Sequence, residues 1–144
     1  MGKSRIVAAV AVIGLLAAST ALAAGSKQVP QTGKVDGDSQ ASAQLVVIKQ
    51  GGAPKSVKNL KLKDLLSNCT NGEARISLRL SGAAKVDDNG KFEKTYVDGS
   101  TKIKFEGKVK RDSSRVHASI SGTTIKITGA GRCDVPNVEF TTKR

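Results

Sequence analysis

Residues 101–110, TKIKFEGKVK, decide the fold, because apolar and charged side chains alternate along the whole segment. Successive side chains of an extended strand point to opposite faces, so a period of two predicts a half-buried β-strand. The inward face takes the uncharged residues Ile103, Phe105, Gly107 and Val109. The outward face takes the charged residues Lys102, Lys104, Glu106, Lys108 and Lys110. The segment therefore predicts a sheet with one face on an apolar core and the other in water.

The same alternation continues on both sides of this strand, and turn residues separate the segments. Residues 75–80 and 115–120 alternate apolar with polar or charged side chains. Residues 87–90, DDNG, and 98–99, DG, are turn signals, because Asn and Gly adopt a positive φ at little cost. No segment after residue 23 has a helical period. These patterns predict an all-β fold, a small antiparallel β-sandwich or barrel of about eight strands.

One predicted strand, residues 92–96, contains a lysine on its apolar face. Lys94 lies two residues from both Phe92 and Tyr96, so an ideal strand would direct its side chain into the core. A bulge at this point would turn the lysine outward. An edge strand would instead let the ammonium group reach water while the methylene groups stay buried. The sequence leaves both readings open.

The first 23 residues predict a signal peptide. Lys3 and Arg5 form a short positive region, residues 6–18 are uniformly apolar, and residues 21–23, ALA, supply a small-x-small cleavage pattern. The apolar run is shorter than the roughly 20 residues of a spanning helix, which disfavours a retained membrane anchor. We expect residues 1–23 to form a helix outside the mature fold. The protein is then secreted or extracellular, with non-covalent attachment to the cell surface left open.

The remaining chain divides into two parts by composition. Residues 24–43 are rich in Gly, Ser, Gln, Lys and Asp and have no apolar period, which predicts a disordered, flexible leader. Residues 44–144 contain the alternating segments and predict a single β domain, long enough to bury one core. The chain has three Phe, one Tyr and no Trp, so Val, Ile and Leu must build that core.

The chain contains two cysteines, Cys69 and Cys133. In an exported protein an even pair predicts a disulfide, here one that ties two neighbouring strand ends or bridges two sheets. Closing a loop of this length is worth about 4 kcal/mol in the chain-entropy model. With one histidine and no CxxC motif, a metal site is not expected, and no motif calls for a cofactor.

Positive charge is the feature with functional content. The formal net charge is +12, and loss of Lys3 and Arg5 with the signal peptide leaves +10. Outward lysines two positions apart lie about 6.6 to 7 Å from each other, comparable to the spacing of phosphates or sulfates on a polyanion. The candidate anion-binding residues are Lys102, Lys104, Lys108, Lys110 and Arg115. Arg75, Arg79 and Lys126 are also expected to point outward, and a shared face would make a broad positive surface. The alternative is an ordinary solvated sheet face protected by lysines.

No arrangement of residues predicts catalysis. His117 is the only histidine and falls on the outward set with Arg115 and Ser119, without an orienting carboxylate or an activated nucleophile nearby in sequence. Neither GxSxG nor HExxH is present. The four aromatic residues are expected in the core, which argues against sugar binding and against base stacking.

The sequence therefore predicts a secreted, non-enzymatic β domain. Its basic sheet face is a candidate for binding anionic polymers or surfaces, such as cell-wall polymer, lipid headgroups or extracellular DNA. The alternative is an extracellular structural or protein-interaction module that uses loops or an exposed strand edge. A hydrolase of unrecognised type is the third and least favoured reading, because it would need a pocket built around His117 or a carboxylate pair.

Overall fold

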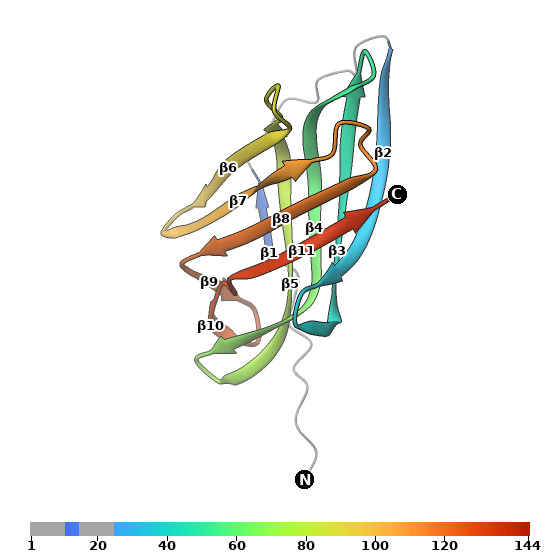
Figure 1. Ribbon diagram of the computed structural model, residues 1–144. Helices are drawn as coiled ribbons and strands as arrows, with labels where there is room; N and C mark the ends of the chain where they lie inside the picture. Colours follow the sequence, from blue (N-terminus) through green and yellow to red (C-terminus); the bar gives the residue numbers. More distant parts are fainter. Residues whose placement is uncertain (1–10, 15–24) are drawn as a thin grey trace.

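A computed structural model describes residues 11–14 and 25–144 (Figure 1). These residues form β-strands joined by short turns and contain no helix. The strands are β1 (Ala11–Gly14), β2 (Ser26–Val35), β3 (Asp38–Gln50), β4 (Ala53–Cys69), β5 (Gly72–Lys85), β6 (Lys91–Asp98), β7 (Thr101–Val109), β8 (Arg115–Gly122), β9 (Thr124–Ile127), β10 (Gly131–Asp134) and β11 (Val138–Lys143). The all-β prediction is confirmed.

The strands form one sheet in the order β1-β5-β4-β3-β2-β11-β8-β7-β6. All pairings are antiparallel except that of β1 with β5. Figure 1 shows β6, β7, β8 and β11 crossing in front of β2 to β5, so the sheet folds over itself into two layers. It is not closed into a barrel: between β5 and β6 the described residues add only an isolated bridge from Val86 to Phe92.

The inward faces of the two layers make the core. As predicted, aliphatic side chains dominate it, and Leu60, Leu62, Ile76 and Ile103 are at most 1% exposed. The three phenylalanines gather in one place. Phe105 lies with its ring centroid 4.9 Å from that of Phe92 and 6.3 Å from that of Phe140. This packing ties together β6, β7 and β11, whose outer faces carry charged residues described below.

The disordered leader expected for residues 24–43 is corrected by the structure. Residues 26–35 form β2, and residues 38–43 begin β3. The buried positions here are Val35, Ala41 and Ala43, and short alanine side chains gave no apolar period to recognise. The strands form because their partners across the sheet bury these small residues.

A buried glutamine also hid the strand character of β2. Gln31 is 1% exposed, and both the nitrogen and the oxygen of its side-chain amide form hydrogen bonds. Its Nε2 donates to the carbonyl of Ser113 at 2.6 Å, and its Oε1 accepts from Thr142 Oγ1 at 2.8 Å. The polar side chain thereby links β2, β11 and the turn between β7 and β8. Tertiary partners, which the sequence does not display, make its burial possible.

Most of the predicted signal peptide lies outside the described residues. Ala11–Gly14 is described, and it forms strand β1, parallel to Leu78–Ser81 of β5, instead of the helix that was expected there. Within residues 11–14 and 25–144, no helix has the length and hydropathy needed to cross a membrane.

The predicted disulfide is confirmed. Cys69 ends β4 and Cys133 lies in β10, and the two residues are direct partners in an antiparallel register with an S–S distance of 2.00 Å. The bond attaches the β9–β10 hairpin to the main sheet, so it ties two neighbouring strand ends.

The position of Lys94 follows from the edge location of β6. Its Nζ donates to the carbonyl of Ala83 at 3.1 Å and lies 5.4 Å from the ring centroid of Tyr96. Gly82 gives the room, because a Cβ at that position would lie 3.2 Å from the lysine Nζ. The side chain therefore covers the tyrosine and ends near the surface, as the edge-strand reading predicted.

Candidate anion-binding surface

Two adjacent rows of outward side chains run across seven strands of the outer face. Directly opposed residues on neighbouring antiparallel strands share a face, so the register defines each row. The first row, from β5 to the end of β7, is Arg79, Lys61, Gln44, Thr32, Lys143, Arg115 and Lys110. The second, from β4 to β6, is Lys63, Ser42, Lys34, Thr141, His117, Lys108 and Lys91. We call these two rows the basic belt.

The belt sets like charges against one another. Nine of its fourteen positions are Lys or Arg, and none is Asp or Glu. Three cross-strand pairs are doubly cationic: Lys61 with Arg79, Lys91 with Lys108, and Arg115 with Lys143. In the described residues no belt side chain forms an ion pair with a carboxylate. Like charges directly opposite one another destabilise a sheet, so this arrangement costs the free protein stability.

Asp64 and Asp112 are two of the carboxylates that border the belt. Asp64 shares a shallow hollow of about 100 Å³ with Lys61, Lys63 and Arg79. Asp112 lies in the turn after β7 and accepts hydrogen bonds from Ser114 of the same turn. The Ser114 hydroxyl donates to it at 2.6 Å, and hydrogen bonds from Ser114 together with the nearby charge of Lys110 lower the pKa of Asp112.

A row of acidic residues lies beside the belt on β6, β7, β8 and β11. By register this acidic row consists of Glu93, Glu106, Ser119 and Glu139. Lys104 pairs with two of the three glutamates in this row. Its Nζ lies 3.7 Å from Glu93 Oε1 and 3.2 Å from Glu106 Oε2. The hydrogen bond and charge of Glu106, followed by the charge of Glu93, raise the pKa of Lys104.

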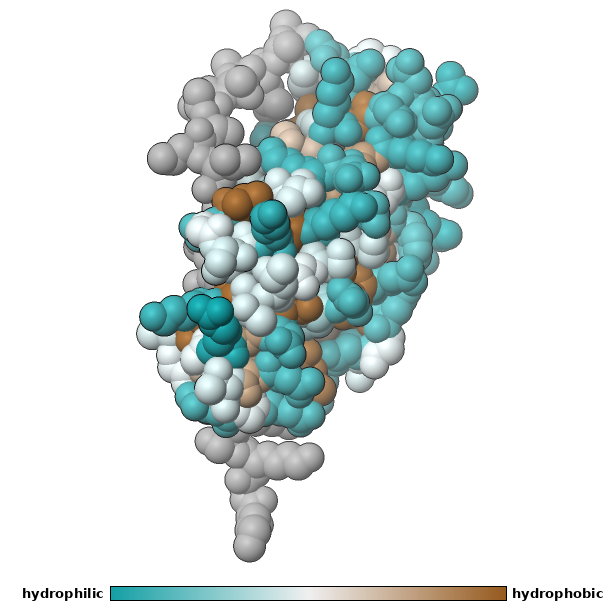
Figure 2. All heavy atoms as spheres, turned by 90° about the vertical axis from the view of Figure 1, so that its left-hand side faces the viewer, coloured by the Kyte–Doolittle hydropathy of each residue, from teal (hydrophilic) through white to brown (hydrophobic). Residues whose placement is uncertain are grey.

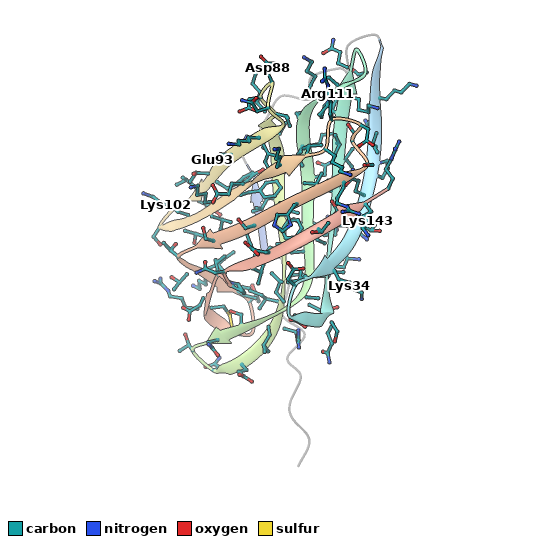
Figure 3. The ribbon with its side chains drawn as sticks, viewed as in Figure 1. Lys34, Asp88, Glu93, Lys102, Arg111 and Lys143 are labelled. Atoms are coloured by element: carbon teal, nitrogen blue, oxygen red, sulfur yellow. A yellow bond between two sulfur atoms is a disulfide. The ribbon has the colours of Figure 1, made fainter. Side chains whose placement is uncertain are left out.

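The predicted lysine ladder is therefore divided. Lys108, Lys110 and Arg115 lie in the belt, whereas Lys104 is occupied by the two glutamates. Lys102 lies beyond the acidic row, opposite Val97, and Figure 3 shows it near the turn between β6 and β7.

The other outward cations also separate. Arg79 joins the belt, Arg75 pairs with Asp38 at 2.5 Å, and Lys126 lies apart on β9. Sequence reasoning missed five belt cations: Lys34, Lys61, Lys63, Lys91 and Lys143. Two of these, Lys34 on β2 and Lys143 on β11, lie on neighbouring strands (Figure 3). Only the strand order brings them together, and no local pattern reports it.

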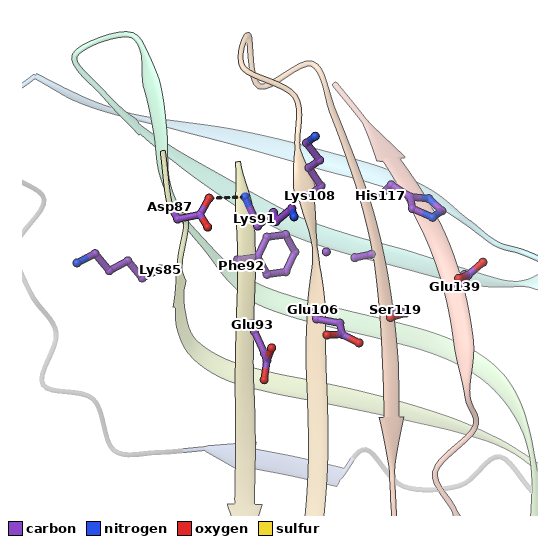
Figure 4. Close-up of a pocket in the computed structure, with 12 residues that line it drawn as sticks. Lys85, Asp87, Lys91, Phe92, Glu93, Glu106, Lys108, His117, Ser119 and Glu139 are labelled. Atoms are coloured by element: carbon purple, nitrogen blue, oxygen red, sulfur yellow. Dashed lines mark hydrogen bonds between the residues drawn. The ribbon is translucent and has the colours of Figure 1, made fainter. Parts of the chain in front are cut away.

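His117 lies within the belt, at the edge of a groove. Its Nδ1 is 3.0 Å from Thr141 Oγ1, and among the described residues no carboxylate is within ion-pair distance of the ring. The groove holds about 650 Å³, and Figure 4 shows Lys108 and His117 on one side of it and Glu106 and Glu139 on the other. The ring is thus placed among charged side chains of both signs.

A second groove continues the belt over the other layer of the sheet. It holds about 600 Å³ and crosses β2 to β5. Four consecutive residues of the first belt row line it: Thr32, Gln44, Lys61 and Arg79. The belt therefore passes through two concave stretches of surface, one on each layer.

Comparison with known proteins adds no relative to this picture. No protein-family model matches the sequence, and comparisons with curated proteins and with solved structures give no match. Within the described residues no group of His, Cys, Asp and Glu could hold a metal ion. The functional argument therefore depends on the surface itself.

Proposed function

We propose that this protein is a secreted, non-enzymatic β domain that binds an anionic polymer along the basic belt. The carrying observation is the set of doubly cationic cross-strand pairs with no carboxylate between them. Such pairs destabilise the free sheet, and an anionic group placed between two cations would remove that cost. The N-terminal sequence and the disulfide support the secreted location.

The spacing of the belt suits a chain of regularly repeated anions. Neighbouring strands are about 4.8 Å apart and outward residues of one strand are about 7 Å apart, so the cations form a grid on that scale. Long, flexible lysine side chains let each ammonium group adjust to a phosphate or sulfate. Binding of this kind weakens steeply with salt, because each contact releases condensed counterions.

A flexible polymer fits the belt better than a flat membrane. The belt follows the sheet from one layer to the other, so a plane could touch only part of it. Membrane association would also require exposed apolar side chains. In the described residues only Leu66 and Val97 are large exposed hydrophobics, and Figure 2 shows a mostly hydrophilic surface on the side in view.

A matched pair of variants tests the proposal. The belt variant carries Lys108→Gln, Lys110→Gln, Arg115→Gln and Lys143→Gln. The control carries Lys55→Gln, Lys102→Gln, Lys126→Gln and Arg132→Gln, which remove the same charge from exposed positions outside the belt. We expect the belt variant to lose at least tenfold in affinity for inorganic polyphosphate and to elute from heparin at much lower NaCl, with a shallower salt dependence. The control should change little.

Equal losses in the two variants would contradict the proposal, because net charge alone would then explain retention. Thermal unfolding of each variant checks that the fold is kept. Since all eight positions are on the surface, neither set should disturb the core.

An interaction module remains the second candidate, and the open edges of the sheet favour it. Strands β5 and β6 share one bridge, from Val86 to Phe92, so much of the backbone edge of β6 has no strand partner among the described residues. An exposed edge of this kind can pair with a strand of another protein. A partner recovered in a pulldown and retained in 1 M NaCl, roughly the regime in which surface charge is screened within about 3 Å, would favour this candidate over polymer binding.

A further inference from the structure

The groove beside His117 has walls of opposite charge. One wall belongs to the belt and is formed by Lys91, Lys108 and His117. The facing wall belongs to the acidic row and is formed by Glu93, Glu106 and Glu139. Figure 4 shows the two sets at different levels along the four strands that cross the site, with the acidic set displaced along the strands from the basic set. A purely anionic ligand would use one wall and be repelled by the other.

The strand period explains why the groove exists. The residues of the two walls are two positions apart along each strand, which separates their Cα atoms by about 7 Å. Between them lie Gly107 and Ala118, whose side-chain positions face the core. The floor therefore consists of backbone together with Phe92 and Ala118, and it carries no charged side chain between the two walls (Figure 4).

The acidic wall has one carboxylate left for a ligand. Lys104 pairs with Glu93 and Glu106 and partly satisfies both. Glu139 is exposed, forms no ion pair in the described part of the chain, and lies opposite Ser119 in the register. The basic wall likewise has capacity, because neither the Lys91 nor the Lys108 ammonium group forms an ion pair in the described residues; Asp87, at the end of this wall, accepts a hydrogen bond from the backbone N–H of Lys91 at 2.9 Å (Figure 4).

We propose that this groove binds a polymer repeat that carries both a phosphate and a primary ammonium group. The inference rests on the proposed function and narrows it from any polyanion to one with amine-bearing repeats. The phosphate lies against Lys108 and His117, and the ammonium group donates to Glu139. A short linker between the two groups matches the separation of the walls.

The groove selects a primary over a quaternary ammonium group. A primary ammonium has N–H donors that pair with carboxylates, whereas a quaternary one is recognised by exposed aromatic faces. All four aromatic side chains of the protein are buried, at 4% exposure or less: Phe92, Tyr96, Phe105 and Phe140. The site offers carboxylates and no aromatic cage.

Three small ligands test this inference on the full chain by NMR titration at low salt. Phosphoethanolamine carries both groups, phosphocholine replaces the primary with a quaternary ammonium, and glycerol phosphate has no cation. We expect phosphoethanolamine to bind at least fivefold more tightly than either of the others. The shifted amides should include those of Lys108, His117, Ser119 and Glu139.

Paired variants then assign the ammonium site. Glu139→Gln should abolish the preference for phosphoethanolamine while leaving the affinity for glycerol phosphate unchanged or slightly higher. Glu73→Gln, which removes the same charge from an exposed position on β5, should leave the preference intact. Equal affinity for the three ligands, or a preference that survives Glu139→Gln, would overturn the inference.

The outcomes separate this inference from the proposed function. Loss of polyphosphate binding in the belt variant, together with no phosphoethanolamine preference, would sustain anionic polymer binding and reject the amine-bearing repeat. A phosphoethanolamine preference without any polyphosphate binding would reject the belt and the inference that depends on it. A membrane target is the remaining outcome. Binding to vesicles that contain phosphatidylethanolamine, with none to poly(glycerol phosphate) esterified with an amino acid, would overturn the assignment to a polymer.

Discussion

Two cross-strand pairs on β6 and β7 lie side by side and are treated in opposite ways. Glu93 faces Glu106, and two residues along the strands Lys91 faces Lys108. Lys104 contacts both glutamates and offsets their repulsion. The ammonium groups of the lysine pair form no ion pair in the described structure, and the one carboxylate at hand, Asp87, accepts from the backbone N–H of Lys91. The same sheet thus neutralises one pair of like charges and leaves the other bare.

Under the proposed function, this difference separates charges that stabilise the fold from charges that bind a ligand. Lys104, a residue of the same chain, bridges the acidic pair, so this pair needs no external cation. The basic pair repeats at Arg115 with Lys143 and at Lys61 with Arg79, so bare repulsion is a property of the whole belt. We attribute it to a ligand that supplies the missing anions.

The largest expected effect comes from opening the disulfide. An unfolded chain keeps the same positive side chains but loses their arrangement in the belt. Reduction, or Cys69→Ser, should lower the free energy of unfolding by about 4 kcal/mol, because the bond closes a loop of 64 residues. Urea unfolding with and without reductant measures the loss. If a reduced and unfolded chain bound polyphosphate as tightly as the folded protein, the arrangement of the belt would be irrelevant.

Reversing one belt charge should weaken binding and strengthen the fold at once. Arg115 stands between Lys110 and Lys143, so Arg115→Glu replaces repulsion on both sides with attraction. We expect a loss of more than tenfold in polyphosphate affinity and a gain of about 0.2–1 kcal/mol in stability. Lys126→Glu, with the same change in charge on β9, serves as the control. A stability loss in Arg115→Glu would show that the belt is not strained by its charge.

Alkaline pH tests the burial of Tyr96, a residue of the edge strand β6. Burial raises the pKa of Tyr96 to about 12, from 10.0. The neutral phenol is therefore favoured in the folded state, and its contribution is complete below pH 10.0 and is lost as the pH rises toward 12. Tyr96→Phe should flatten the fall in unfolding midpoint over this window. If the unfolding midpoint of Tyr96→Phe fell as much as that of the parent, groups other than Tyr96 would account for the loss of stability in alkali.

The smallest effect concerns the bridge in the acidic row. Lys104→Gln should lower the unfolding midpoint slightly at pH 7, because it exposes Glu93 and Glu106 to each other. The pKa of Lys104 is raised above 10.5 in the folded state, so its contribution is present below that pH and disappears as the pH rises further. The variant and the parent should therefore converge in alkali. In contrast, Lys108→Gln should leave the midpoint unchanged or raise it.

The fold was largely predictable because most of its strands alternate locally. The period of two along residues 101–110 and 115–120 predicted two adjacent strands, β7 and β8, and the paired cysteines predicted the disulfide. The prediction failed at β2 and β3, where Ala41, Ala43 and Gln31 occupy inward positions. Burial at those positions depends on distant partners, so local hydropathy does not report it.

The candidate site was predictable only in part, for a related reason. Alternation placed Lys108 and Lys110 on the outer face, and the structure agrees. It could not show that Lys104 is bridged to Glu93, nor that Lys143 and Lys34 complete the belt, because those relations depend on strand order. The register between strands distant in sequence carries the functional information here.

The position of β11 bears on how the chain is made. It lies between β2 and β8, whereas every other neighbour along the main antiparallel path follows chain order. Residues 138–143 are the last of the described strands to be synthesised. Until then, the half-sheets β2 to β5 and β6 to β8 lack the strand that pairs with both. Strand β11 therefore joins the two half-sheets, so a chain shortened before residue 138 would lack the hydrogen bonds that link β2 to β8.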